Sequence, residues 1–438
     1  MFTESPEYIK RRNTPFSPPT ITWKELRAVI PPELFRKSTF RGMVSFVKDV
    51  ASVVILFALG QRIDGFAAEV AVARELTPGV ASVLKWTLWS AYWYAQSIAM
   101  AGCWCLGHEA GHQNVSPYGV VNDTVGYILH TALLTPYFAW KRSHHTHHKT
   151  VGSIERDENY VPRTKSELGI TTKEQLHEMF EETPLYTLVR MCVMQLLGFQ
   201  VYLLFNTLGS PHDPAGTNHF SPYSVLFKPE DFWNIVLSDA GLVVTSSLLI
   251  KYGMQVGAAN LFKQYIFPYL VCLGSAQLRF RRLIERQLCH HWIVMLTYLH
   301  HSDPTLPHYR KGQWTFLRGC LATVDRPLLG YIGRLYFHNV SHDHIGHHLF
   351  TSIPYYNQPE VTKRIKAVLG VHYNGDNTNT FYALYRSFTT CCYIEDEGDV
   401  VMYSNGKGET MREVVQDPGN RRESDAIPDM LTSLHTAG

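Results

Sequence analysis

Three histidine tracts carry the strongest chemical signal in this 438-residue sequence, which contains 22 histidines. Within each tract the histidines recur at i and i+4, or at i, i+3 and i+4, a spacing that places them on one face of a helix. Imidazole is a good ligand for iron, zinc, copper and nickel. Eight same-face imidazoles exceed what one metal ion binds, so the sequence predicts two metals held by His108, His112, His144, His147, His148, His344, His347 and His348.

Iron that activates O₂ is the expected metal, because a two-metal site rich in nitrogen stands beside segments apolar enough for a membrane. A single histidine is more often structural than metal-binding, but burying this many basic groups without a metal would be costly. His301 is an expected ninth ligand, and His338 is an expected hydrogen-bond donor to the ligands. No catalytic residue beyond the metal ligands is predicted. The other histidines are expected to be structural or on the surface: His145, His290, His291, His300, His308 and His342.

Two other classes of protein fit part of this pattern. His108-Glu109-Ala110-Gly111-His112 matches the H-E-x-x-H motif of zinc proteases, with Glu109 as the general base of an intramembrane protease. That motif is short and leaves two tracts unexplained. A metal transporter would need its ligands near the middle of the bilayer, whereas these tracts follow the ends of apolar runs. An enzyme with two irons is therefore the favoured interpretation.

Apolar runs beside the tracts predict an all-α, polytopic membrane protein. Trp86–Leu106 is the clearest of them, with 21 residues and no charge, and a helix needs about 20 residues to cross a bilayer. An earlier uncharged run, Val50–Gly60, is short. Tryptophan and tyrosine cluster in and near these runs, and both residues favour membrane interfaces.

The three tracts must meet on one side of the membrane to share a metal site. The chain must therefore cross the membrane an even number of times between His148 and His344. Two crossings are available, namely Ile235–Val256 and the joined runs Gln264–Val271 and His290–Leu299. Met191–Leu208 would then lie along the interface.

Net charge and cysteine spacing exclude some classes of partner and site, and the polarity of the chain predicts its division into domains. A net charge of +2 is too small to indicate a nucleic-acid partner, and the eight cysteines show no C-x-x-C spacing that would indicate a zinc site. Residues 1–20 are expected to be a disordered cytosolic arm, 21–396 the membrane domain, and 397–438 a polar tail with a β-like patch at 397–405. Segment 272–289 places four arginines inside what would otherwise be one membrane span, and arginines within a span are costly. The segment is therefore expected to be an anomalous insertion. It is either a retained intron or an amphipathic loop on the membrane surface.

Motifs along most of the chain resemble those of the acyl-lipid delta-12 and omega-3 fatty acid desaturases of plants and fungi. The resemblance runs from about residue 20 to residue 396. It rests on the first histidine tract and on residues 136–143 (PYFAWKRS), 155–158 (ERDE), 237–241 (LSDAG), 306–309 (LPHY), 322–326 (ATVDR) and 350–354 (FTSIP). The sequence departs from the family where His342 and Asp343 precede the third tract, since an acidic residue and a threonine usually stand there.

The resemblance implies a membrane fatty acid desaturase with four transmembrane helices and a histidine-rich di-iron cap on the cytosolic side of the endoplasmic reticulum. It implies O₂ as co-substrate and electrons from cytochrome b5, a separate protein, and its NADH-dependent reductase. Conversion of oleate to linoleate on a membrane lipid is the expected reaction. Relatives that act as acetylenases, hydroxylases, conjugases or omega-3 desaturases are the alternatives. A homodimer is compatible with these features.

Overall fold

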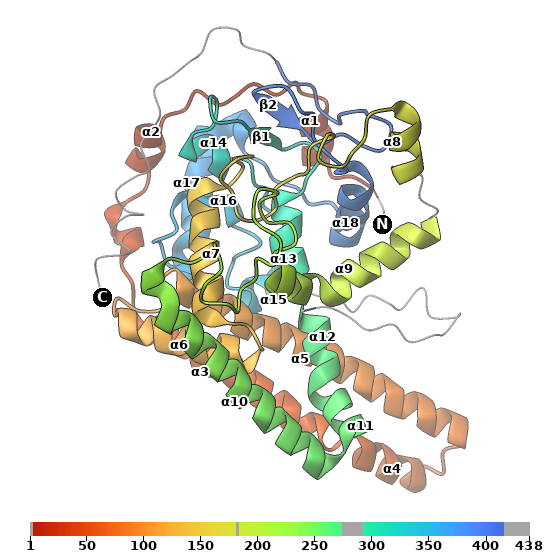
Figure 1. The fold of residues 1–438 in the computed structure, drawn as a ribbon. Helices are drawn as coiled ribbons and strands as arrows, with labels where there is room; N and C mark the ends of the chain where they lie inside the picture. Colours follow the sequence, from red (N-terminus) through yellow and green to blue (C-terminus); the bar gives the residue numbers. More distant parts are fainter. Residues whose placement is uncertain (1–2, 181–183, 274–291, 416–438) are drawn as a thin grey trace.

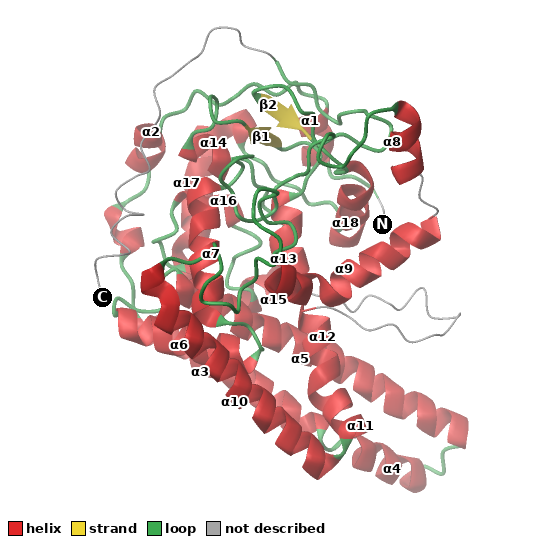
Figure 2. Ribbon diagram, in the orientation of Figure 1, coloured by secondary structure: helices red, strands yellow, loops and turns green. Residues whose placement is uncertain are grey.

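Helices make up most of the computed structural model, which describes residues 3–180, 184–273 and 292–415. Figure 1 shows long helices gathered in the lower part of the molecule and shorter helices, joined by long loops, forming a cap above them. The only sheet in these described ranges is the antiparallel pair of β1 (Pro307–Tyr309) and β2 (Val400–Met402), drawn as arrows in Figure 2. The prediction of a mostly helical protein is confirmed.

The lower part consists of a helical bundle around α5 (Pro78–Gly111). Helices α3 (Thr39–Gly60), α4 (Ile63–Ala73) and α12 (Phe267–Leu273) all pack on α5. Helix α10 (Phe232–Val256) packs on α6 (Gly119–Ala132) and α7 (Tyr137–Thr150), and its far end leads through α11 (Ala258–Leu261) and a π-helical turn (Phe262–Ile266) into α12. The chain thus travels out along α10 and returns along α12 (Figure 1).

Two of these helices are long and apolar enough to cross a membrane, namely α3 and the stretch Pro229–Val256 that includes α10. Only 11% of the most apolar part of the first is buried, and only 17% of the second. Large side chains such as Val54, Leu248 and Ile250 therefore lie more than half exposed along both helices. A continuous apolar surface of this kind marks contact with a membrane or a partner.

The sequence-based choice of spans needs correction. Helix α3 begins eleven residues before the uncharged run Val50–Gly60, so that expected short run is part of a 22-residue helix that includes Lys48 and the buried Asp49. Trp86–Leu106, expected to be the clearest span, lies within α5, whose last 16 residues, from Gln96 to Gly111, are all buried in the protein. At 1.5 Å per residue the 34-residue α5 is about 51 Å long, so it extends from the bundle into the cap.

The cap surrounds the upper end of α5 with segments that come before, between and after the bundle helices in sequence. Its helices are α2 (Trp23–Ala28), α8 (Lys173–Phe180), α9 (Pro184–Phe205), α13 (Trp292–His301), α14 (Phe316–Cys320), α15 (Gly330–Tyr336), α16 (His344–Leu349), α17 (Gln358–Leu369) and α18 (Thr380–Thr390). Short 3₁₀ turns lie at Pro32–Phe35, Pro229–Asp231, Tyr355–Asn357 and Gly370–His372. Helix α9, which covers most of the run expected along the interface, lies above the bundle in Figure 1 and is inclined to its long helices.

The prediction of a disordered N-terminal arm is wrong. Residues Pro6–Arg12 form helix α1, which the Ser5 side chain caps by accepting a hydrogen bond from the Tyr8 N–H. Arg11 reaches into the cap, where it donates hydrogen bonds to the Thr305 hydroxyl at 2.7 Å and the Gly375 carbonyl at 2.8 Å. A guanidinium held in this way orders the segment, because a buried charge must be paired.

The C-terminal part of the chain also joins the cap. Strand β2 lies within the β-like patch expected at 397–405 and pairs with β1. The residues that follow 396 are therefore part of the cap. Val414 forms a further bridge with Phe16 near the N-terminus. The anomalous segment 272–289 falls almost wholly outside the described residues, which resume at Trp292.

Candidate metal centre

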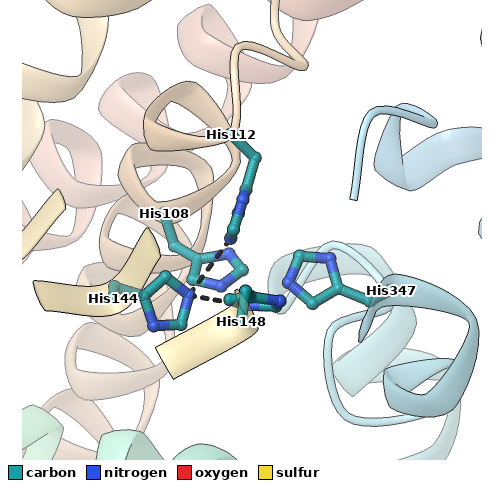
Figure 3. Close-up of side chains that lie close together, drawn as sticks. All are labelled: His108, His112, His144, His148 and His347. Atoms are coloured by element: carbon teal, nitrogen blue, oxygen red, sulfur yellow. Dashed lines mark hydrogen bonds between the residues drawn. The ribbon is translucent and has the colours of Figure 1, made fainter. Parts of the chain in front are cut away.

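Nine histidines from four helices converge at the upper end of α5. The last turns of α5 supply His108 and the residue that follows the helix, His112, while α7 supplies its three histidines at i, i+3 and i+4. Helix α13 ends at His301, and α16 begins at His344. Figure 3 shows five of the rings pointing toward one another across the space between α5, α7 and α16. The eight tract histidines and His301 are thereby brought together.

The first group of ligand atoms comes from all three tracts. One ring nitrogen from each of five histidines lies within 4.8 Å of the others, namely from His108, His112, His144, His148 and His347. The Nε2 atom of His144 lies 3.1 Å from Nε2 of His112 and 3.0 Å from Nε2 of His148 (Figure 3). Such a cluster of nitrogens has the chemistry of a site for one transition-metal ion.

The second group lies directly beside the first. His147, His301 and His348 offer nitrogens within 4.8 Å of one another. His344 completes this group, because its Nε2 atom lies 3.1 Å from Nε2 of His301 and 3.2 Å from Nε2 of His348. The rings of His148 and His348 stack at a centroid distance of 4.0 Å, which joins the two groups. The structure therefore contains histidine clusters able to bind two metals.

The donor set fits metal ions better than it fits a network of hydrogen bonds. Many of the short contacts join one Nε2 to another, and a neutral imidazole has a single N–H to share among several such neighbours. The Nε2 atom of His347 is buried without a hydrogen-bond partner among the described residues. Burial lowers the pKa of His347 to about 3 and holds the pKa of His148 well below its usual range. Both rings are thus neutral, which is the form that binds a metal.

Two carboxylates orient these rings from behind. The Nδ1–H of His147 donates to Asp157 Oδ1 at 2.8 Å, and Asp157 is itself held by the backbone N–H groups of Gly152 and Asn159. Glu109 Oε1 lies 3.2 Å from Nδ1 of His108 and 3.5 Å from Nδ1 of His347. A hydrogen-bonded outer partner such as Asp157 fixes which ring nitrogen of His147 faces the metal. Apart from its place in the ERDE motif, nothing in the sequence singles out Asp157.

Replacing Asp157 with asparagine is expected to lower metal affinity or activity about 10- to 100-fold, the usual cost of losing an outer partner of a histidine ligand. The amide cannot hold the His147 N–H as strongly as a carboxylate does. Iron content of the purified protein, measured beside product formation, checks this. Glu155→Gln, an exposed change in the same loop, is the matched control. Wild-type iron and activity in Asp157→Asn would contradict the orienting role.

Glu109 does not have the setting of a protease general base. Its carboxylate sits between two histidine rings and accepts a hydrogen bond from the Asn114 amide at 3.1 Å. It is also absent from the wall of the cavity described next. Because the other two tracts complete the same centre, the zinc-protease interpretation finds no support in this geometry.

An apolar cavity of about 550 Å³ opens onto both groups of histidines. Ligand pockets commonly have volumes of about 300–1,000 Å³ and mostly apolar walls. His108 and His144 of the first group line it, together with His147, His301 and His344 of the second. The rest of the wall comes largely from α9 and α13, with residues such as Met194, Gly198 and Val294. Tyr160 stacks on His301 at 5.0 Å with nearly parallel rings and also lines the cavity.

Of the remaining histidines, His145, His300 and His338 lie outside the centre, whereas His290 and His291 fall outside the described residues. His338, expected to donate to a ligand, instead places its Nε2 atom 2.7 Å from Oδ2 of Asp49 in α3, so that expectation is wrong. His145 hydrogen-bonds the Gly111 carbonyl, and the fully buried His300 hydrogen-bonds the Val324 carbonyl, as structural residues do. Neither His342 nor Asp343 lines the apolar cavity.

Comparisons with known proteins agree with this centre. The fatty acid desaturase family model matches residues 86–379. Delta-12 fatty acid desaturases of Mortierella isabellina and Mortierella alpina are each 37% identical to this chain over 395 residues, which is 88% of this chain and 91% of each relative. The oleate hydroxylase FAH12 of Claviceps purpurea is 35% identical over 416 residues, covering 90% of this chain and 81% of the relative. With its clustered histidines and the match over two thirds of its length, this chain belongs to the fatty acid desaturase family of oxidoreductases.

Proposed function

We propose that this protein is a di-iron acyl-lipid desaturase that converts oleate to linoleate by inserting a double bond at the delta-12 position. The observation that carries the proposal is the apolar cavity whose wall includes histidines of both metal groups. An acyl chain in that cavity would lie directly against the centre. The 37% identity to two delta-12 desaturases supports this bond position.

The chain's own residues bind and orient the acyl chain. Apolar side chains of α9 and α13 exclude water from it, and the Trp140 and Trp104 rings pack beside the histidines that face it. His108, His112, His144, His148 and His347 would hold one iron, and His147, His301, His344 and His348 the other. When bound, the iron pair supplies O₂ activation and the removal of two hydrogens from neighbouring carbons.

The second candidate function is formation of a different product, such as a hydroxylated acyl chain, because similar proteins are named for such activities. Hydroxylases of Claviceps purpurea and Ricinus communis match this chain at 35% and 33% identity, and an acyl-lipid (9+3)-(E)-desaturase of Dimorphotheca sinuata matches at 34%. Similar chains thus form different products from related substrates. Acetylenase, conjugase and omega-3 desaturase activities are further alternatives, and they rest on the resemblance of the sequence motifs alone.

The proposal extends to the membrane and the electron source. Helices α3, α5, α10 and α12, the last continued by α13, would provide four crossings of the endoplasmic reticulum membrane, with the cap in the cytosol. One relative of Brassica juncea is named as an omega-6 desaturase of the endoplasmic reticulum. Cytochrome b5 and its NADH-dependent reductase would deliver the electrons.

Expression in a yeast strain that lacks its own delta-12 desaturase tests the proposal directly. Gas chromatography with mass spectrometry of the lipids reports both the type and the position of the new group. Linoleate that appears only with the intact protein supports the proposal. A hydroxylated, conjugated or triple-bonded product, or a double bond elsewhere, would replace it with the corresponding alternative.

Gly198→Leu is expected to shift the preference toward shorter acyl chains, because Gly198 lies on the wall of the cavity. Even a Cβ at this position would meet the Met194 side chain at 3.3 Å, so a larger group must occupy cavity space. We expect turnover of 18-carbon substrate to fall about tenfold, in line with the 1–3 kcal/mol that a steric mismatch in an apolar pocket costs. The ratio of 16- to 18-carbon products measures this. Leu204→Ala, at a half-exposed position on α9 that does not line the cavity, distinguishes a blocked cavity from a disturbed helix. An unchanged ratio in Gly198→Leu would mean that the acyl chain lies elsewhere.

A further inference from the structure

Another cavity, of about 380 Å³, lies in the cap and shares no wall residue with the apolar cavity at the metal centre. Its wall comes from α1 and the residues just after it, from parts of 325–342 and 366–377, and from Arg412. Helix α1 lies at the top of the cap in Figure 1, on the side away from the long bundle helices. Small-ligand pockets commonly have volumes of about 300–1,000 Å³. The cavity is therefore large enough to hold a small molecule.

Basic side chains outnumber acidic ones on this wall by six to three. The basic ones are Lys10, Arg11, Arg326, Arg334, Lys366 and Arg412, and the acidic ones are Glu7, Asp325 and Asp376. All three acidic side chains already have partners. Asp376 pairs with two arginines. The Asp325 carboxylate accepts a hydrogen bond from the Tyr373 hydroxyl at 2.6 Å, and Glu7 accepts one from the Asn377 amide at 3.1 Å.

Three of the basic side chains, in contrast, have no acidic partner. Within the described ranges, no carboxylate lies at ion-pair distance from Lys10, Lys366 or Arg412. Lys10 and Lys366 are exposed, and the Lys366 ammonium lies over the Tyr373 ring at 4.7 Å. A cavity lined in this way attracts anions, because its walls concentrate the field of one sign of charge.

Arg412 is the most informative of the three because it is only 8% exposed. Its Nε donates to the Thr14 carbonyl at 2.8 Å and its Nη1 to the Thr305 carbonyl at 3.3 Å, but its Nη2 bonds to nothing in the part of the chain that the structure describes. Burial lowers the pKa of Arg412 to about 10, and the charge of Arg11 acts in the same direction. A buried charge is costly unless it is paired, so this guanidinium favours an anion in the cavity.

Arg412 also belongs to a buried cluster in which positive charge is in excess. Its members, each no more than 8% exposed, are Arg11, Arg326, Arg386, Arg412, Asp303 and Asp376. Four guanidinium groups and two carboxylates leave an excess of two positive charges. Thr305 links the two arginines nearest the cavity, because its hydroxyl accepts from Arg11 and its carbonyl from Arg412. The Nη2 atom of Arg11 lies 3.6 Å from Asp303 and makes no hydrogen bond with any described residue.

A phosphate ester has the charge and shape that suit this site. A phosphate monoester carries about −1.5 to −2 charges at neutral pH, which offsets the excess in the cluster, whereas a single carboxylate would offset half of it. Guanidinium groups bind phosphate oxygens through parallel N–H groups, and lysine adds a flexible point charge. The exposed apolar helices α3 and α10 belong to the bundle, and α1 lies on the opposite side of the molecule (Figure 1). This position favours a ligand from water over the headgroup of a lipid.

We propose that the cavity binds the phosphate group of a water-soluble phosphate ester, with Arg412 as the buried anchor and Lys10 and Lys366 at the exposed rim. The bound group would also brace the end of α13, which carries His301. Asp303 follows that histidine by two residues, and Arg326 donates to the Leu299 carbonyl at 3.0 Å. The site does not depend on which product the enzyme forms.

Thermal unfolding of the full-length protein in phosphatidylcholine nanodiscs tests the proposal. Inorganic phosphate and glycerol 3-phosphate are the probes, added at constant ionic strength so that screening of charges stays the same. A ligand that binds only the folded state stabilises it, so each probe should raise the unfolding temperature by about 3 °C at a hundredfold excess over its dissociation constant. Chloride at the same ionic strength should cause no such shift. Equal shifts from chloride and phosphate would overturn the site.

Variants of the wall show where the probe binds. Arg412→Gln removes the anchor and should weaken binding of both probes about tenfold or more, the effect of losing a hydrogen bond to a charged group. Because Arg412 also holds two backbone carbonyls, the double variant Lys10→Gln with Lys366→Gln keeps the test independent of folding. It should weaken binding about tenfold as well. Lys363→Gln, exposed on α17 and absent from the wall, is the matched control and should resemble wild type.

Two further results would overturn the proposal. One is equal affinity for phosphate in wild type and in the double lysine variant. The other is a rise in unfolding temperature that appears when phosphatidic acid replaces part of the phosphatidylcholine but not with the soluble probes, since the phosphate would then belong to a lipid. The product formed in yeast tests the desaturase assignment separately, so failure of one proposal leaves the other standing.

Discussion

His148→Ala is expected to reduce product to less than about 1% of wild type, because losing even an outer partner of a ligand costs about 10- to 100-fold. His148 is nearly fully buried and belongs to the first group, where its Nε2 atom lies 3.0 Å from Nε2 of His144. Its ring also stacks at 4.0 Å on His348 of the second group. Removing it therefore disturbs both groups at once, and iron per chain should fall together with product.

His145→Ala is the matched control, one turn away on the same helix. The His145 Nε2 atom hydrogen-bonds the Gly111 carbonyl at 2.9 Å instead of facing the other metal-facing nitrogens. This variant should retain iron and most of its activity. Product and metal content would be measured in the same yeast membranes, beside protein abundance. Equal activity in the two variants would remove His148 from the centre.

Asp376→Ala is expected to destabilise the folded protein by about 3–5 kcal/mol, the usual cost of removing one partner from a buried ion pair. Asp376 Oδ2 lies 2.6 Å from both Arg326 and Arg386, and its Oδ1 accepts a hydrogen bond from Ser5 before α1. The pKa of this carboxyl is held well below its usual range by the two guanidinium groups. Without Asp376, the arginines would share Asp303 as their remaining buried carboxylate partner.

A loss of that size is a large part of the 5–15 kcal/mol that stabilises a typical domain. Thermal unfolding in detergent should therefore begin at a markedly lower temperature, and the protein should accumulate poorly in cells. Arg12→Ala on α1 is the control, because its pair with Glu4 is partly exposed and such pairs contribute about 0–1 kcal/mol. Equal unfolding temperatures for the two variants would show that the buried cluster does not stabilise the cap.

The histidine tracts could be predicted from sequence because their signal is local. Spacing along one helix decides which rings share a face, and the structure places His144, His147 and His148 of α7 in the centre, although in different groups. Which ring joins which group depends on how α5, α7, α13 and α16 meet, and no local pattern contains that information. For the same reason, His301 was identified only as a candidate and His338 was assigned a partner that it does not have.

Long-range partners of charged residues made the prediction wrong in both the helical bundle and the cap. Lys48 and Asp49 made the first apolar run look short, yet α3 continues through them because Asp49 finds a buried partner in His338, 289 residues away. The polar N-terminus looked disordered, yet Arg11 pairs with Asp303 and Thr305 far along the chain. Such pairs are invisible in sequence because they join segments that only the folded chain brings together.

The metal content of the purified, full-length protein tests the central claim most directly. Nine convergent histidines in two adjoining groups predict about two irons per chain, in preparations that also introduce a double bond into an acyl lipid when given O₂ and NADH-derived electrons. His148→Ala should lower that number in the same assay, and His145→Ala should leave it near two. One zinc per chain, or full activity in protein stripped of iron, would contradict the di-iron account.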